Sequence, residues 1–158
     1  MTVIAVEYLS KDQFLVSVFK ESSPEAKVVW LRGELRQSVE QILGHRYAGL
    51  RIRYWRSQSA DDRTAWVLDE IGKELPITAG FVVANNTIES VQILAFRESR
   101  GGAVRYPSFT RQFQELSLTG DHYLDGHIDG ISGATLSVRA ITRLSRLALF
   151  LHQQVTAQ

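Results

Sequence analysis

A predicted β-hairpin is the sequence feature that most restricts the fold of this chain. Residues 77–84 and 88–96 are β-branched and apolar runs, and Asn85-Asn86 between them accepts the positive φ angles of a two-residue turn. We expect the two arms to be central in a sheet. Hairpin-linked strands pair antiparallel. Further strands are predicted at residues 27–31, 50–56 and 64–71.

Helical patterns are interspersed with these strands. Ser10 and Gln13 have the spacing of a capping box, and residues 34–43 form an amphipathic segment that stops at Gly44. Pro107 suits the first position of a short helix. From residue 135 onward, apolar residues recur at intervals of three and four, which predicts the longest helix. The sequence therefore predicts an α+β fold, a twisted, mainly antiparallel sheet with flanking helices and a long C-terminal helix.

Length and composition restrict the classes of function. A chain of 158 residues that is 44% apolar suits a single domain, with residues 1–70 and 71–158 as two portions of it. The net charge of +1 gives no general attraction to nucleic acid or to an anionic membrane. The absence of cysteine excludes disulfides, iron–sulfur clusters, thiolate zinc sites and covalent c-type haem. Any electron transfer would therefore need an organic cofactor.

The sequence does not indicate the compartment. No stretch approaches the roughly 18 uninterrupted apolar residues of a membrane span. Residues 1–8 lack the basic start and the long apolar centre of a secretory signal, so we expect a leader to be absent or removed. The lack of cysteine fits either side of a membrane.

The segment Asp129–Thr135 is the candidate functional motif. It directly precedes the last predicted helix, whose first amides and dipole attract a phosphate, while Gly133 and Ala134 allow close approach to the backbone. Thr135 would present a hydroxyl there. The motif holds no histidine or lysine to activate this hydroxyl, so a separate enzyme would have to form the bond. In the alternative interpretation, Asp129 or Ser132 caps the helix and Thr135 is an ordinary first-turn residue.

This motif resembles the signature of the covalent FMN-binding domain family. The family includes subunits of the sodium-translocating NADH:quinone reductase and of the Rnf complex, and small stand-alone proteins. Its signature is Asp-x-x-Ser/Thr-Gly-Ala-Thr/Ser. Every fixed position is matched here, by Asp129, Ser132, Gly133, Ala134 and Thr135. The resemblance extends upstream over about half the chain and includes Glu98-Ser-Arg-Gly-Gly102, where the family often has threonine at the position of Ser99.

The resemblance implies a flavoprotein electron carrier rather than a turnover enzyme, with FMN joined to Thr135 by a phosphoester. In the family, a magnesium-dependent flavin transferase installs this group from FAD. The transferase is therefore the implied maturation partner, and redox proteins, membrane-bound ones among them, are the implied functional partners, with no role for nucleic acid. Because members usually face the outside of the cytoplasmic membrane, a periplasmic or membrane-associated location is implied. Residues 71–158 would be the FMN-binding portion.

The flavin ring would need an apolar or aromatic wall and a few hydrogen-bond donors. The loop and short helix that we expect to face Thr135 supply the candidates, which are Glu98, Ser99, Arg100, Arg105, Tyr106, Phe109 and Phe113. An arginine near the ring would favour its reduced anion. Alternatively, the phenylalanines are core residues and the arginines are solvated loop charges.

Two other functions have some support in the sequence. A divalent-metal hydrolase would use ligands within eight positions, namely His122, Asp125, His127 and Asp129. A single-strand nucleic-acid platform would use interleaved basic and aromatic residues, namely Arg51, Arg53, Tyr54, Trp55 and Arg56. The near-zero net charge argues against the platform. The last predicted helix also carries an arginine edge, Arg139, Arg143 and Arg146, where we expect a redox partner to dock.

Overall fold

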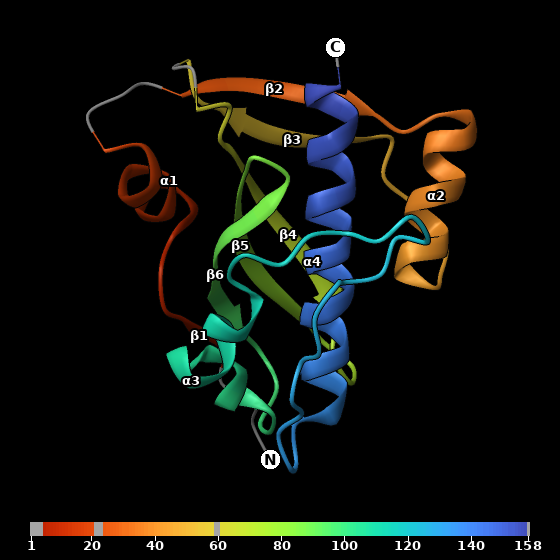
Figure 1. The fold of residues 1–158 in the computed structure, drawn as a ribbon. Helices are drawn as coiled ribbons and strands as arrows, with labels where there is room; N and C mark the ends of the chain where they lie inside the picture. Colours follow the sequence, from red (N-terminus) through yellow and green to blue (C-terminus); the bar gives the residue numbers. More distant parts are fainter. Residues whose placement is uncertain (1–4, 21–23, 59–60, 158) are drawn as a thin grey trace.

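The computed structural model describes residues 5–20, 24–58 and 61–157. These residues form one antiparallel sheet of six strands in the order β1-β6-β5-β4-β3-β2, with helices on both faces (Figure 1). The strands are β1 (Val6–Glu7), β2 (Glu25–Trp30), β3 (Arg51–Arg56), β4 (Thr64–Ile71), β5 (Pro76–Ala84) and β6 (Thr87–Phe96). The helices are α1 (Lys11–Phe19), α2 (Gly33–Leu43), α3 (Pro107–Thr110) and α4 (Thr135–Thr156), with 3-10 turns η1 (Gly102–Arg105) and η2 (Arg111–Phe113). The predicted α+β fold is confirmed.

The predicted hairpin consists of β5 and β6. Asn85 and Asn86 adopt φ angles of 54° and 61°, and Ala84 pairs with Thr87 across the turn. From β2 to β6 each strand pairs with the next one in the chain, so the sheet is a meander. The sequence did not indicate β1, which joins the outer edge of β6 through two residue pairs only.

Helix α1 covers one face of the sheet. Its start is the predicted capping box, in which the Ser10 hydroxyl accepts the Gln13 amide at 3.1 Å and Gln13 Oε1 accepts the Ser10 amide at 2.9 Å. Phe14 of this helix lies against Gly80, where a Cβ atom would be only 2.6 Å from the aromatic ring. Glycine is therefore required at this position of β5. The smaller apolar cluster lies here and consists of Phe14, Phe19, Trp55, Ala65, Val82 and Leu94.

Helix α4 covers the opposite face and, with α2, buries the larger apolar cluster. The predicted end of α2 is confirmed, because Gly44 has a φ of 78°. The loop before α4 crosses this helix towards α2 and returns to the helix start (Figure 1). Arg146 of α4 donates to the carbonyl oxygens of His122 in this loop at 2.6 Å and of Ile42 in α2 at 3.3 Å. The loop, α2 and α4 are thus tied together by one guanidinium group.

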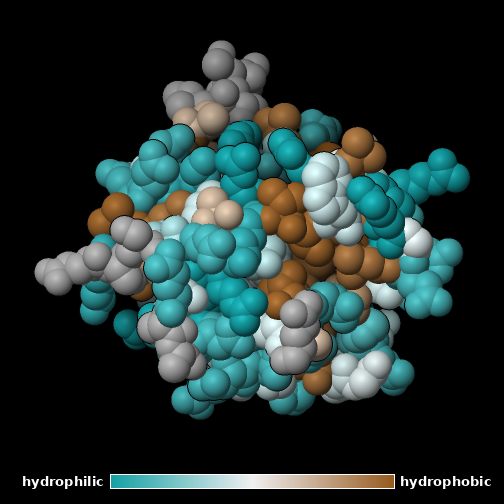
Figure 2. All heavy atoms as spheres, turned by 90° about the horizontal axis from the view of Figure 1, so that it is seen from above, coloured by the Kyte–Doolittle hydropathy of each residue, from teal (hydrophilic) through white to brown (hydrophobic). Residues whose placement is uncertain are grey.

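The surface seen in Figure 2 is mostly hydrophilic, whereas the interior consists of the two apolar clusters. Seen from above, the molecule is mostly hydrophilic, with hydrophobic residues exposed in a patch between hydrophilic ones (Figure 2). Within the described part of the chain, no helix combines the length and the hydropathy that crossing a membrane requires.

Candidate functional site

The start of α4 carries the candidate motif. Thr135 is the first helical residue and is exposed, and Ala134 precedes it as the N-cap. Gly133 has a φ of 81°, and the Ala134 amide donates to the Ile131 carbonyl at 2.9 Å, which forms the turn into the helix. No side chain makes a capping hydrogen bond to this helix. The interpretation of Asp129 or Ser132 as its cap is therefore wrong, and the first-turn amides have no side-chain acceptor.

Asp129 and Ser132 lie on the exposed side of this turn. The Asp129 amide donates to Gln112 Oε1 at 2.7 Å, which holds the backbone of the motif against η2. The Asp129 carboxylate is 84% exposed and lies 3.2 Å from His127 Nε2. The carboxylate is thus available to another macromolecule.

A cleft of about 310 Å³ lies beside the first turn of α4. One wall is formed by the end of the motif and the first residues of the helix, Gly133, Ala134, Thr135, Leu136 and Ser137. The other wall comes from the β4–β5 turn and the loop after β6, and consists of Lys73, Glu98, Arg100 and Gly101. The structure therefore brings five predicted site residues together, namely Glu98, Arg100, Gly133, Ala134 and Thr135.

Glu98 holds the β4–β5 turn. Its Oε1 accepts the backbone amides of Glu74 at 2.5 Å and Leu75 at 2.6 Å. These two amide hydrogen bonds, with the nearby charge of Lys73, lower the pKa of Glu98 below its usual value. Lys73 lies on the turn that Glu98 fixes, and the sequence analysis missed it. The sequence signal for Lys73 was its position as a cation just before the hairpin, within the segment that resembles the family.

Three segments meet at Ser137, a buried residue that the sequence analysis also missed. Gly101 has a φ of 90°, and a Cβ atom there would overlap the Ser137 hydroxyl. A Cβ on Gly72, in the β4–β5 turn, would lie 3.8 Å from the same oxygen. Small residues at these positions allow the turn, the loop after β6 and α4 to approach closely. The cleft therefore depends on glycine at position 101.

The remaining candidates do not line this cleft. Ser99 is exposed outside it. Arg105 lies over the rings of Tyr8 and Tyr106, 5.1 and 4.6 Å from their centroids, and donates to both hydroxyls. Phe109 is 2% exposed and packs edge-to-face on Phe113 with ring centroids 5.4 Å apart. The core interpretation of the two phenylalanines fits, because α3 and η2 turn their apolar side inward onto β6.

The candidate metal ligands do not converge. Among the described residues there is no group of three or more histidine, aspartate or glutamate side chains that could hold a metal ion. Asp125 Oδ1 accepts the Ser117 amide at 3.0 Å, and the His122 ring packs edge-on against Phe150 at 4.8 Å. His127 pairs with Asp129 at the surface. The arrangement does not support a metal-dependent hydrolase.

The nucleic-acid platform is not supported either. Tyr54 is buried and stacks on Trp66 with ring centroids 4.7 Å apart, and Trp55 is buried against α1. Arg56 forms an ion pair with Asp62. Since alternate residues of β3 point into the two apolar clusters, its aromatic rings are not available for stacking on bases.

The predicted arginine edge of α4 is only partly a free surface. Arg139 is exposed, but Arg143 and Arg146 are half-buried. The Arg146 guanidinium also lies over the Tyr123 ring, 4.2 Å from its centroid. The loop that crosses α4 covers this part of the helix, which the periodicity of the helix could not show.

Comparison with known proteins identifies the family. Residues 72–149 match the family model of the FMN-binding domain. This segment belongs to the FMN-binding domain family. The matched segment contains every residue that lines the cleft at the start of α4. The family resemblance drawn from the Asp129–Thr135 motif is thus confirmed.

A solved structure has a similar fold over nearly the whole chain. The crystal structure of Shewanella oneidensis NqrC matches with a TM-score of 0.65 and 13% sequence identity, over 97% of this chain and 92% of that chain. The two proteins therefore share a fold along nearly their whole lengths. No curated protein sequence matches this chain.

Proposed function

We propose that this protein is a flavoprotein electron carrier whose FMN is joined through its phosphate to Oγ1 of Thr135. One observation carries the proposal. Within an FMN-binding domain, a threonine hydroxyl stands at the first position of a helix that no side chain caps, in a cleft that also contains Lys73 and Arg100.

The residues of the cleft fit the phosphate end of the cofactor. Unpaired amides and the helix dipole stabilise an anion at the start of α4, and Gly133 and Ala134 leave room for it. Lys73 and Arg100 add positive charge on the opposite wall. Leu136, 44% exposed, supplies apolar surface next to Thr135. Bound FMN would supply reversible oxidation and reduction, and these side chains would anchor and orient it.

The attachment reaction requires a second protein. A bond would form between Thr135 Oγ1 and the FMN phosphorus of FAD, the pyrophosphate bond would break, and AMP would leave. The hydroxyl proton needs a base, but the lining of the cleft contains no histidine, and its carboxylate, that of Glu98, already accepts the backbone amides of Glu74 and Leu75. A flavin transferase would provide the base. The exposed Asp129 carboxylate is a suitable contact for that enzyme.

Covalent attachment suits a carrier that exchanges electrons with successive partners. A tethered flavin does not dissociate, so the cleft is free to remain open to solvent and to partner proteins. The fold shared with NqrC supports redox proteins, including membrane-bound ones, as partners. A periplasmic or extracytoplasmic location would accompany such partners.

Flavin attachment is the direct test of the proposal. Co-expression with a flavin transferase should give a yellow protein that keeps its flavin through denaturation and precipitation. Intact-mass and peptide mass spectrometry should find one FMN group on the peptide that contains Thr135. Thr135→Val removes the hydroxyl at similar volume and should abolish the adduct, whereas Thr135→Ser should retain it. Covalent flavin on the valine variant would contradict the attachment site.

A further inference from the structure

The outer edge of β6 is paired at its C-terminal end. β1 pairs with Phe96 and Ala95 there. The next carbonyl along the edge, that of Leu94, accepts the amides of Tyr8 and Leu9 at 2.7 and 3.2 Å. Beyond this point the chain turns away into α1 (Figure 1).

The same edge is paired again near the N-terminal end of β6. The Ile88 amide donates to the Leu116 carbonyl at 3.0 Å, and the Ile88 carbonyl accepts the Glu115 amide at 2.8 Å. Between these two pairings, no strand of the described chain lies beside residues 89–93. Five residues of a strand span about 17 Å, the length of a typical partner strand.

Backbone groups of this open stretch point away from the sheet. In an antiparallel strand, alternate residues direct both the N–H and the C=O group to the same edge. Ile88 and Leu94 use the outer edge, as their hydrogen bonds show. The β5–β6 pairing has an extra β6 residue between Ile88 and Ser90 and another between Ile93 and Ala95. Ser90 and Gln92 therefore face Val82 and Gly80 of β5, whereas Val91 and Ile93 direct their backbone groups outward. A strand edge of this kind is a template for an added strand.

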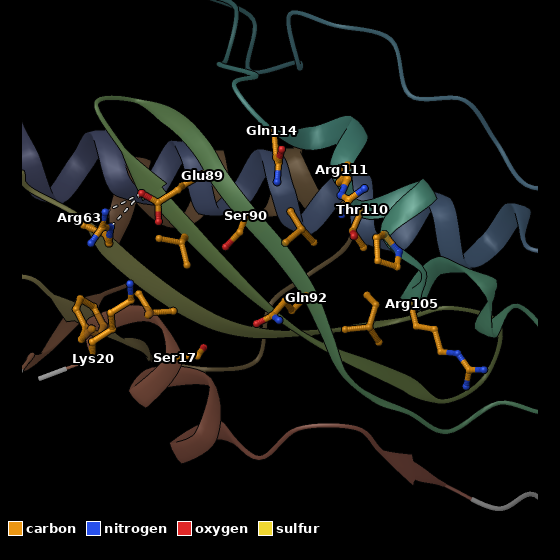
Figure 3. Close-up of a pocket in the computed structure, with 16 residues that line it drawn as sticks. Ser17, Lys20, Arg63, Glu89, Ser90, Gln92, Arg105, Thr110, Arg111 and Gln114 are labelled. Atoms are coloured by element: carbon orange, nitrogen blue, oxygen red, sulfur yellow. Dashed lines mark hydrogen bonds and ion pairs between the residues drawn. The ribbon is translucent and has the colours of Figure 1, made fainter.

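A groove of about 600 Å³ follows the open edge, between α1 on one side and α3 with η2 on the other (Figure 3). Its lining is polar and carries an excess of positive charge. Four cationic side chains, Lys20, Arg63, Arg105 and Arg111, accompany a single carboxylate, Glu89. Arg63 pairs with that carboxylate at 2.8 Å. Three cations therefore remain without a carboxylate in the groove.

We propose that the open edge of β6 binds an extended acidic segment of a partner protein by strand addition. Main-chain hydrogen bonds to Val91 and Ile93 would supply the pairing, and carboxylates of the added strand would meet Lys20 and Arg111 on the two walls. The groove reaches Arg105, the last residue of η1. η1 begins beside Gly101, which lines the cleft at the start of α4. A segment bound there would hold its protein close to the cleft.

A short capped peptide of alternating glutamate and valine is the probe. It should bind saturably in fluorescence anisotropy and should slow amide hydrogen exchange at Val91 and Ile93, which NMR resolves individually. A peptide with lysine in place of glutamate should not bind. A peptide with proline in place of valine keeps the charge but cannot pair as a strand, so it should bind at least about tenfold more weakly. These measurements do not need flavin, so their outcome is independent of the proposed attachment.

Charge reversal at the groove provides a matched pair of variants. Arg111→Glu should weaken binding of the acidic peptide about fivefold or more, whereas Arg46→Glu, at an exposed arginine in the loop after α2 and outside the groove, should leave it unchanged. Absence of saturable binding, equal affinity for the proline peptide, or unchanged exchange at Val91 and Ile93 would overturn the proposal. Dimerisation through this edge in sedimentation would also overturn it, because the occupant would then be a second copy.

Discussion

At the scale of single residues, His152 forms a buried hydrogen bond between α4 and strand β4. The side chain is 2% exposed, and its Nδ1 lies 2.7 Å from Thr64 Oγ1. Thr64 Oγ1 also accepts the Trp66 indole N–H at 2.8 Å, so this hydroxyl has two ring nitrogens as partners. Burial lowers the pKa of His152 from 6.5 to about 4. The histidine therefore remains uncharged in the folded protein at neutral pH.

This histidine should make folding stability depend on pH. Between pH 6.5 and about 4 the unfolded chain binds a proton that the folded protein excludes, so stability falls as the pH falls. From pH 7 to pH 5 the loss attributable to His152 should be about 2 kcal/mol. Urea unfolding at both pH values measures it. His152→Gln does not titrate and should show a smaller loss, and an equal loss in both proteins would assign the dependence to other groups.

A substitution at Gly101 tests the geometry of the cleft at the start of α4. Gly101→Ala adds a Cβ atom at a positive φ and directly against the Ser137 hydroxyl, so it should destabilise the protein by about 1–3 kcal/mol. It should also reduce the yield of flavinylated protein, because the loop that carries Arg100 must move. Gly120→Ala is the control, since a Cβ there meets nothing within 4 Å. Similar unfolding midpoints and yields for both variants would contradict the close approach at Gly101.

At the scale of elements, α1 approaches the sheet closely where Phe14 lies against Gly80 of β5. Gly80→Ala would place a methyl group 2.6 Å from the Phe14 ring and should cost about 1–3 kcal/mol in denaturant unfolding. Phe14→Leu removes the ring and leaves a cavity of its own. The double variant should therefore be more stable than the sum of the two single effects predicts. Strict additivity would show that the two residues do not press on one another.

The elements that the sequence predicted are those with local signals. The turn at Asn85, the capping box at Ser10 and the end of α2 at Gly44 each need only their own neighbours in the chain. Strand β1 could not be predicted, because two residues carry no periodicity and their partners lie far along the chain. Lys73 was missed for the same reason, since only the folded sheet brings it beside Thr135. Ser137 was missed because its close contact with Gly101 also depends on the fold. The stripe of Phe109 and Phe113 indicated burial but not which surface it is buried against.

At the scale of the whole molecule, both portions of the chain contribute to one sheet. Residues 1–70 contain β1, β2, β3 and most of β4, and they cover one side of β5 and supply all of α1. We predict that the portion 71–158 does not fold alone, because β5 would become an edge strand and the apolar face of α4 would be exposed. Circular dichroism melting and NMR amide dispersion test this. Residues 5–158 should fold and serve as the control, and a cooperative transition in the shorter portion would contradict a single domain.

The order of elements along the chain has a consequence for biosynthesis. Every strand of the sheet precedes α4, and the larger apolar cluster closes only when this helix packs. The ribosome therefore releases Thr135 after all six strands have emerged. The other wall of the cleft, which lies in the β4–β5 turn and in the loop after β6, has emerged by then as well. If the proposed transferase binds only this assembled surface, FMN is attached only to chains that have completed folding. Unfinished or truncated chains then stay colourless.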